Sequence, residues 1–424
     1  MRLPAALRAL REREFRLLFV GQGLSLVGDG MVNVALPFAV LDLTGSVTDL
    51  GFVFAAFTLP LVAFLLVGGV FADRFEQRGV MVASDLTRFA SQGLVAVLLV
   101  SGQARIWELV VLQAVRGAAV AFFMPASTAL TPSTVPPELL QEANALRGIS
   151  LAFGQVIGPA VGGFVVAGIG PGWAIGVDSV SYAVSALFLV ALRLPRRESL
   201  PPQPFLHDLL DGWREFTART WVWSNLALIG VGNTVFNSTF VLGAAVAKRS
   251  LGGAGAWGLI LGALGLGAVI GGVVALRIRP GRPLVTANLW LIPFALPPAL
   301  LALRPPLAVI VVGAGVGGIG GTVFNAIWET ALQRHIPPER LSRVTAYDWF
   351  VSTAANPLGQ AVSGPAAGAI GIDATLAVAA GWLAAAPFLT LAIPSIRSLT
   401  ADGYESIEPR VADEVEAPPV GDDG

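Results

Sequence analysis

The 424-residue chain has no cysteine, two histidines and a single lysine, Lys248. Without cysteine it forms no disulfide, no thiolate nucleophile and no thiolate metal site. His207 and His335 both lie outside the long apolar runs, so neither a zinc site nor a Ser-His-Asp triad is indicated. Lys248 is not part of a P-loop, which excludes an ATP-driven pump. We therefore expect neither an enzyme nor a bound cofactor or metal.

Charge is also scarce. Charged residues make up 13% of the chain and hydrophobic residues 54%, whereas a soluble protein carries about 25% charged residues. The net charge of −1 does not suggest a nucleic-acid partner. Apolar segments of about 20 residues are typical of helices that cross a lipid bilayer. We find twelve, at 15–41, 47–72, 79–101, 105–130, 143–169, 172–193, 221–246, 256–276, 283–303, 306–332, 344–370 and 374–396. The sequence predicts an all-α integral membrane protein.

The positive charges indicate its orientation. Most of the 27 lysines and arginines lie at the amino terminus, in the loops after even-numbered segments and in the tail. The other loops hold only Arg105, Lys248, Arg249 and Arg304. Because positive loops stay inside, both termini are expected in the cytoplasm, with the chain multi-pass in the cell membrane, a bacterial inner membrane.

The two halves of the chain repeat one another. "TALTPSTVPPELLQEANAL" from Thr128 matches "TALQRHIPPERLSRVTAY" from Thr330, at offsets that decrease from 204 to 201 along the chain. Six-helix halves in the same orientation form a parallel repeat with a pseudo-twofold axis, as in many secondary transporters. We divide the chain into 1–193, a linker 194–220 with an amphipathic helix at 205–219, a second half 221–397, and an acidic, disordered tail 398–424.

A turn with the sequence "GGVFADRFEQR" follows the second segment. Its pattern of Gly69, Asp73, Arg74 and Arg78 resembles the signature of the major facilitator superfamily. With "LSLVGDGMVNVALPFAV" and "PPELLQEANAL", the chain resembles the branch of enterobactin-exporter-like and macrolide-efflux-like proteins. The resemblance implies the major facilitator fold and a cytoplasmic gate in which Asp73 holds one half against the eleventh helix.

We expect Asp85 and Arg88, three residues apart, to extend that gate. The second half keeps Arg277 but has Leu276 and Asn288 where Asp73 and Asp85 stand in the first. The gate is therefore expected mainly in the first half. Topology alone would also explain the arginines.

A polar stripe runs along the first apolar segment. Asp29 lies about 21 Å along it, and Arg116 in the fourth segment reaches a similar depth. A carboxylate inside the membrane is a functional candidate, so we predict an Asp29–Arg116 pair that binds a proton; a static packing pair is the alternative. Asp178 is the next proton candidate. Further residues expected along the cavity are Gln22, Asn33, Asn233, Asn237, Phe122 and Phe324.

Glycines repeat in the segment 143–169. The motif consists of Gly154, Gly158, Pro159, Gly162 and Gly163. Glycines four residues apart allow close helix contact, and we expect the halves to move against each other along this stripe. The motif resembles that of drug–proton antiporters, which are exporters, although an upstream glycine of the motif is Ala145 here. Incidental packing glycines are the alternative.

These features predict a proton-coupled secondary exporter of a small amphipathic molecule, drug-like or a secondary metabolite, working by alternating access as a monomer. A siderophore exporter or an importer of the same fold is the alternative, and a non-transporting membrane sensor a distant third. The partners are the substrate, protons and the lipid bilayer.

Overall fold

The computed structural model describes residues 5–194, 213–214, 216–336 and 338–400. The regular elements of this part are helical. Residues 401–424 of the predicted tail, and residues 205–212 and 215 of the predicted amphipathic helix, lie outside the described residues; residues 213–214 and 216–218 of that segment are helical.

Six long helices form the first half. They are α1 (Arg13–Thr44), α2 (Val47–Arg74), α3 (Gln77–Val100), α4 (Ile106–Leu130), α5 (Leu140–Ile169) and α6 (Pro171–Val190). The short 3-10 helices are Ala5–Arg11, Thr131–Thr134 and Pro137–Leu139.

The second half contains more breaks. Its elements are α8 (Thr220–Val246), α9 (Ala254–Ala275), α10 (Pro283–Leu291), α11 (Leu296–Leu303), α12 (Leu307–His335), α13 (Pro338–Ala354), α14 (Asn356–Ile370), α15 (Ile372–Leu391) and α16 (Pro394–Ser398). A π-helical turn, Ala247–Leu251, extends α8, and the 3-10 helix η5 (Ile292–Ala295) joins α10 to α11.

Prolines explain the two broken spans. Pro293, Pro297 and Pro298 remove backbone donors between α10 and α11, and Pro357 does so just after the break at Ala355 between α13 and α14. The described residues contain 11 helical stretches long and apolar enough to cross a membrane, with α10 to α11 counted as one. The α13–α14 pair supplies the remaining predicted segment, 344–370. The predicted all-α membrane fold is confirmed.

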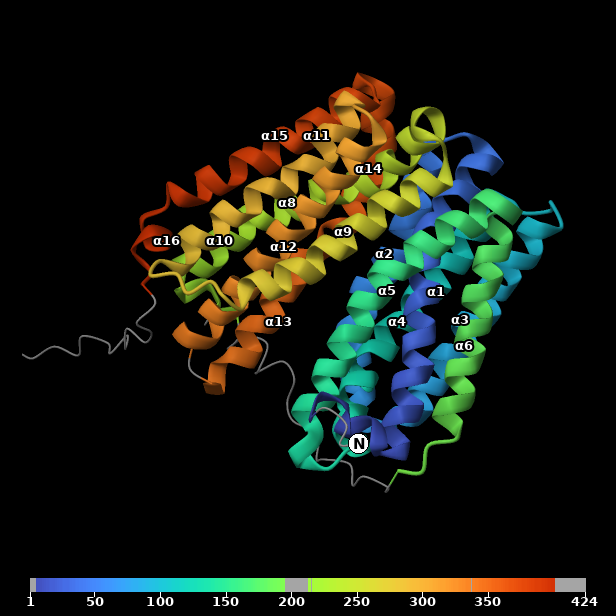
Figure 1. The fold of residues 1–424 in the computed structure, drawn as a ribbon, viewed down its shortest axis with the longest axis horizontal. Coiled ribbons are helices and arrows are strands. Elements are labelled where there is room, and N and C mark those ends of the chain that lie inside the picture. The colour runs from blue at the N-terminus through green and yellow to red at the C-terminus, as the bar shows by residue number, and fades with distance from the viewer. Residues whose placement is uncertain (1–4, 195–212, 215, 337, 401–424) are drawn as a thin grey trace, which may run out of the picture.

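The repeat is visible in the backbone. Gly170 ends α5 with φ 97°, and Gly371, 201 residues later, ends α14 with φ 89°; both conformations favour glycine. In the first half α1 packs against α5 and α6, and in the second α8 packs against α14 and α15. Figure 1 shows the blue-to-green first half and the yellow-to-red second half as two inclined bundles.

We call the end of the molecule where α1 begins the basic end, and the end where α1 stops the far end. The halves touch through α5 against α9 and through α14 against α2. The carbonyl oxygen of Pro159 approaches Gly258, and that of Gln360 approaches Gly51. Pro159 lies in the far half of α5, and Gly258 and Gly51 lie in the first two turns of α9 and α2, which begin at the far end. Gln360 lies in the far half of the span formed by α13 and α14, so the halves are joined toward the far end (Figure 1).

Candidate transport site

A charged cluster lies inside the first half. Arg116 Nη2 on α4 donates to Asp29 Oδ1 on α1 at 2.6 Å, and the hydroxyl of Tyr182 on α6 donates to the same oxygen at 2.6 Å. Arg116 is 7% exposed, whereas Asp29 is 33% exposed. The pair predicted from depth alone is therefore formed, with its carboxylate partly accessible and its guanidinium buried.

Asp85 and Arg88 lie in the same interior. The two side chains form an ion pair on α3, 0% and 3% exposed respectively. The Arg88 guanidinium also stacks over the rings of Phe123 and Tyr182, 4.1 Å and 4.3 Å from their centroids. The contacts of Arg88 thus go to α4 and α6, and its place in the cytoplasmic gate stays a prediction, because the side chains of Asp73 and Arg74 lie outside the described residues.

Asp178 is fully buried and is held by amides. Gln92 donates to Asp178 Oδ2 at 3.3 Å, and Gln113 donates to Gln92 Oε1 at 2.9 Å. A Cβ built on Gly28 would lie 2.6 Å from Asp178 Oδ1, so this glycine brings the carboxyl group close to α1 beside Asp29.

Sequence reasoning missed Tyr182, Gln92 and Gln113. Their signal was the i, i+4 spacing from Asp178 to Tyr182 and the i, i+4 spacing from Arg88 to Gln92.

The gate turn is described only in part. Arg78 donates to the carbonyl of Leu192 at 2.7 Å and lies 3.4 Å from Glu76, which fastens the start of α3 to the end of α6. Gly69 and the side chains of Asp73 and Arg74 lie outside the described residues, so the gate assigned to them stays a prediction.

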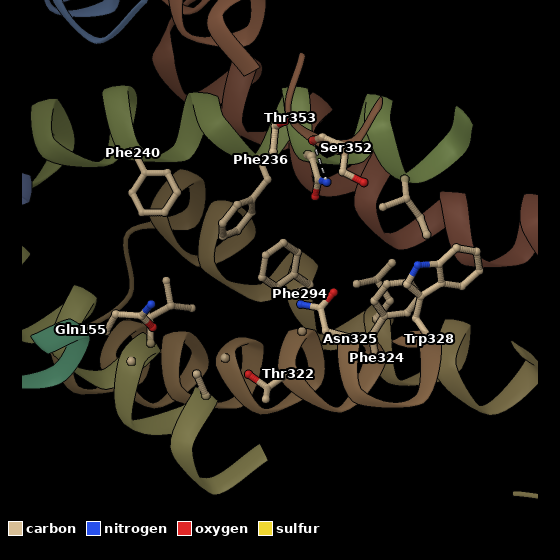
Figure 2. A pocket seen from close by; sticks show the side chains of 18 of the residues that line it. Gln155, Phe236, Phe240, Phe294, Thr322, Phe324, Asn325, Trp328, Ser352 and Thr353 are labelled. Carbon is tan, nitrogen blue, oxygen red and sulfur yellow. Dashed lines mark hydrogen bonds between the residues drawn. The ribbon is translucent and has the colours of Figure 1, made fainter. Parts of the chain in front are cut away.

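The second half holds a cavity of about 620 Å³ that reaches the first half through Asn33 on α1 and Gln155 and Pro159 on α5. Figure 2 shows the rings of Phe236, Phe240 and Phe294 along it, with Asn325 and Thr322 from α12. The described residues of its lining include two acids, Glu329 and Asp348, and no base.

Three of the predicted residues, Asn33, Asn233 and Phe324, line this cavity. Asn233 donates to the carbonyl of Ser352 at 3.2 Å. Asn237 sits one turn further along, donating to Asn233 O and accepting from Gln360.

A second cavity, of about 610 Å³, lies within the first half. Gln22 lines it and donates to Ser127 at 2.7 Å. Phe122, expected along the cavity, is not among the described residues that line these two cavities; its ring stacks on that of Phe64 with the centroids 6.3 Å apart, and its role in the cavity stays a prediction. Phe123 lines the first-half cavity instead, since one residue turns a helix by about 100°.

The glycine motif of α5 serves two contacts. Cβ atoms built on Gly154, Gly158 and Gly162 would lie 2.6–2.8 Å from backbone atoms of α1, within the same half. Gly163 and Pro159 face Ala254 and Gly258 of α9, across the halves. The expectation that the halves move along the Gly154–Gly158–Gly162 stripe was therefore wrong, because this stripe packs inside one half. The glycines facing the opposite half belong mainly to α9, at 258, 262 and 265.

The described side chains include no group of three or more histidines or acids that could hold a metal ion. Each of the two cavities is large enough for a small organic molecule.

Comparison with known proteins identifies the family. The model of the family described as transmembrane secretion effector matches residues 4–419. The enterobactin exporter EntS of Escherichia coli O1:K1 / APEC is 29% identical over 367 residues, which cover 84% of this chain and 85% of that protein. The protein of that name from Shigella boydii serotype 18 is also 29% identical over 84% of this chain and 85% of its own.

Two solved transporters share the fold. The nucleoside transporter NupG superposes with a TM-score of 0.74 at 14% identity, covering 89% of this chain and 98% of its own. A bacterial homolog of the human lysosomal transporter Spinster superposes with a TM-score of 0.70 at 16% identity, covering 94% and 99%. With the family model matched over nearly the whole length, the chain belongs to the major facilitator superfamily, in the family of transmembrane secretion effectors, and is a multi-pass membrane transporter.

Proposed function

We propose that this transporter exports a small amphipathic organic molecule in exchange for protons. The observation that carries the proposal is the Asp29–Arg116–Tyr182 cluster: an intramembrane carboxylate, partly accessible, with a buried cation as its partner. A carboxylate inside a membrane has a high energetic cost, so its presence there indicates a functional role.

Protonation of Asp29 supplies the switch. The ionised carboxylate accepts charge-assisted bonds from Arg116, and a protonated carboxyl group loses the ionic part of that attraction. Protonation of Asp29 leaves the buried Arg116 without a negative partner, which destabilises this arrangement of the helices. In the proposed cycle, proton uptake therefore drives the conformational change that follows substrate release.

The change at Asp29 has a route to the contact between the halves. Its neighbour Gly30 packs directly on Gly158 of α5, with the two backbones in contact. The next residue of α5, Pro159, presents its carbonyl oxygen to Gly258 of α9 in the other half. A shift of α1 against α5 is therefore transmitted to the contact between the halves, here called the seam, through the adjacent residues Gly158 and Pro159.

Orientation follows from the positive charges. With the basic end in the cytoplasm, the halves joined at the far end correspond to a cavity accessible from inside. Residues 1–193 and 221–397 act as the two moving halves in this proposal, joined by the linker 194–220, and residues 398–424 form a cytoplasmic tail. A single chain holds both halves, so we propose a monomer in a bacterial inner membrane.

A siderophore exporter is the second candidate. It is favoured by the 29% identity to enterobactin exporters over most of the chain. An importer of the same fold, which would run the same cycle in the opposite direction, is the other alternative.

Everted membrane vesicles test the proposal. With the lumen acidified, the addition of a transported compound should release protons from the lumen as the compound enters. A panel should contain drug-like amphiphiles and siderophores, with vesicles lacking the protein as the control. Accumulation that persists unchanged after the pH gradient is collapsed would refute proton coupling, and movement only in the opposite direction would identify an importer.

A further inference from the structure

The cavity of the first half has an unusual charge pattern. Two arginines, Arg88 and Arg147, line it, and no acid is found among the described residues of its lining. The charge of Arg88 is compensated by the buried pair with Asp85. Arg147 has no acidic side chain within ion-pair distance in the part of the chain that the structure describes, and its hydrogen bond goes to Ser127 Oγ at 3.2 Å. One positive charge thus faces the cavity without compensation.

A small polar group surrounds that charge. Ser127 Oγ accepts from both Gln22, at 2.7 Å, and Arg147. Because both bonds use the oxygen, the Ser127 hydroxyl hydrogen is left to donate to a ligand. Arg147 retains further guanidinium donors, which form a planar fork that matches an oxyanion.

The rest of the cavity is apolar. Phe19, Leu26, Phe123 and Leu151 supply walls around a volume of about 610 Å³, enough for a drug-sized molecule. An apolar volume with one uncompensated guanidinium at its edge suits a molecule with an aromatic or aliphatic body and one anionic group.

The repeat argues that the charge is specific to this half. The positions equivalent to Ser127 and Arg147, at offsets of 202 and 201, are Glu329 and Asp348, which line the other cavity. Arg147 and its equivalent Asp348 therefore carry opposite charges, and the neutral Ser127 is answered by an acid, so an anion is favoured in the first-half cavity and not in the second.

We propose that Arg147, with Ser127 and Gln22, forms the binding site for the anionic group of an amphipathic organic anion, whose apolar body fills the first-half cavity. The proposal deepens the proposed function, on which it rests for the claim that this ligand is the transported substrate.

Matched fluorescent probes test the site. 8-Anilinonaphthalene-1-sulfonate carries one sulfonate, and N-phenyl-1-naphthylamine has the same aromatic body without it. Each is titrated into the full chain in nanodiscs of uncharged phosphatidylcholine, with empty nanodiscs subtracted. Arg147→Gln should raise the Kd for the sulfonate about tenfold and change that for the neutral probe by less than about twofold, since a charge-assisted bond is lost.

Two control variants and one competition complete the test. Arg16→Gln removes an exposed arginine outside the cavity lining, and Glu329→Gln removes one of the two acids of the opposite cavity; neither should weaken sulfonate binding. In the parent protein, 2-naphthoate should displace the sulfonate about tenfold better than 2-naphthamide, which tests the site without any variant. An equal Kd in parent and Arg147→Gln, or equal displacement by the two competitors, would overturn the proposal.

The two proposals can fail separately, because binding requires neither transport nor a proton gradient. Arg147-dependent binding without proton-coupled export would refute the proposed function but not the proposed binding site. Proton-coupled export that Arg147→Gln leaves intact would refute the site as the substrate's and leave the function.

Discussion

At the position where α1 carries Asp29, bonded to Arg116 and Tyr182, α8 carries Asn233, bonded to a backbone carbonyl. Other charged and polar residues of the first half are likewise replaced by uncharged residues at the equivalent positions of the second half. Equivalent positions pair Asp85 with Asn288, Arg88 with Leu291, Gln92 with Ala295, Arg116 with Gly318, Asp178 with Ala379 and Tyr182 with Leu383.

The comparison separates what duplication preserves from what it does not. Gly158 packs on Gly30 in the first half, and its equivalent Gly359 packs on Thr234, the equivalent of Gly30, in the second. Backbone contacts are thus retained while the side chains around them differ. The first half has a core of acidic and basic side chains, such as Asp85 with Arg88, and the second has amide contacts such as Asn288 with Asn225.

The largest expected difference between the halves is in stability. Asp85→Ala leaves the buried Arg88 without its partner, which should cost about 3–5 kcal/mol. Asn288→Ala, the matched change in the second half, removes a neutral hydrogen bond and should cost about 1–2 kcal/mol. Unfolding of the detergent-solubilised protein measures both losses. Equal losses would show that the Asp85–Arg88 ion pair stabilises the protein no more than the neutral hydrogen bond of Asn288 does.

The gate gives the next largest contrast. Asp73→Asn should lower the transport rate about tenfold or more at normal abundance, because the amide loses the charge-assisted contacts of a carboxylate. Leu276→Asn at the equivalent turn should leave the rate within about twofold. Transport by Asp73→Asn at the parent rate would show that the turn serves topology alone.

The seam between the halves can be separated from packing within a half. Gly158→Ala should destabilise the protein by about 1–3 kcal/mol, since its Cβ would lie 2.6 Å from Gly30 Cα. Gly258→Ala places a Cβ 2.5 Å from Pro159 O across the halves and should instead shift the equilibrium toward the state open at the far end.

Cysteine labelling at the far end, together with thermal unfolding, distinguishes these effects. Gly168→Ala on α5 and Gly272→Ala on α9 are the controls, because a Cβ there meets nothing within 4 Å. Increased far-end labelling in Gly158→Ala but not in Gly258→Ala would reverse the assignment.

The smallest contrast concerns two equivalent phenylalanines. Phe324 lines the second-half cavity, whereas Phe122 stacks on Phe64 of α2. Phe324→Leu should raise the apparent KM for an aromatic substrate a few-fold, and Phe122→Leu should leave it unchanged. A larger effect from Phe122 would restore it as a cavity residue.

Much of the fold could be predicted from the sequence, because a bilayer requires long apolar helices and because the loop sequences of the two halves match each other. The Asp29–Arg116 pair was also predictable, since few charges occur at that depth and a buried cation requires an anion.

Other features could not be predicted. Glycines at 154, 158 and 162 reveal a smooth helix face but not which helix meets it, and α1 and α9 both contact α5. Tyr182 and Gln92 carry no charge, so nothing required them to have a partner in the cluster. Phe122 was placed by equivalence to Phe324, yet the inward aromatic of α4 is the next residue, Phe123.

The central claim is that Asp29 couples protons to transport, and reconstituted Asp29→Asn tests it most directly. An amide cannot exchange a proton, but its oxygen still accepts from Arg116 and Tyr182, so the helices should remain in place. Substrate exchange between two sides at equal concentration should survive, uphill accumulation driven by a pH gradient should be lost, and Asn233→Ala should retain both. Uphill accumulation by Asp29→Asn at the parent rate would contradict the account.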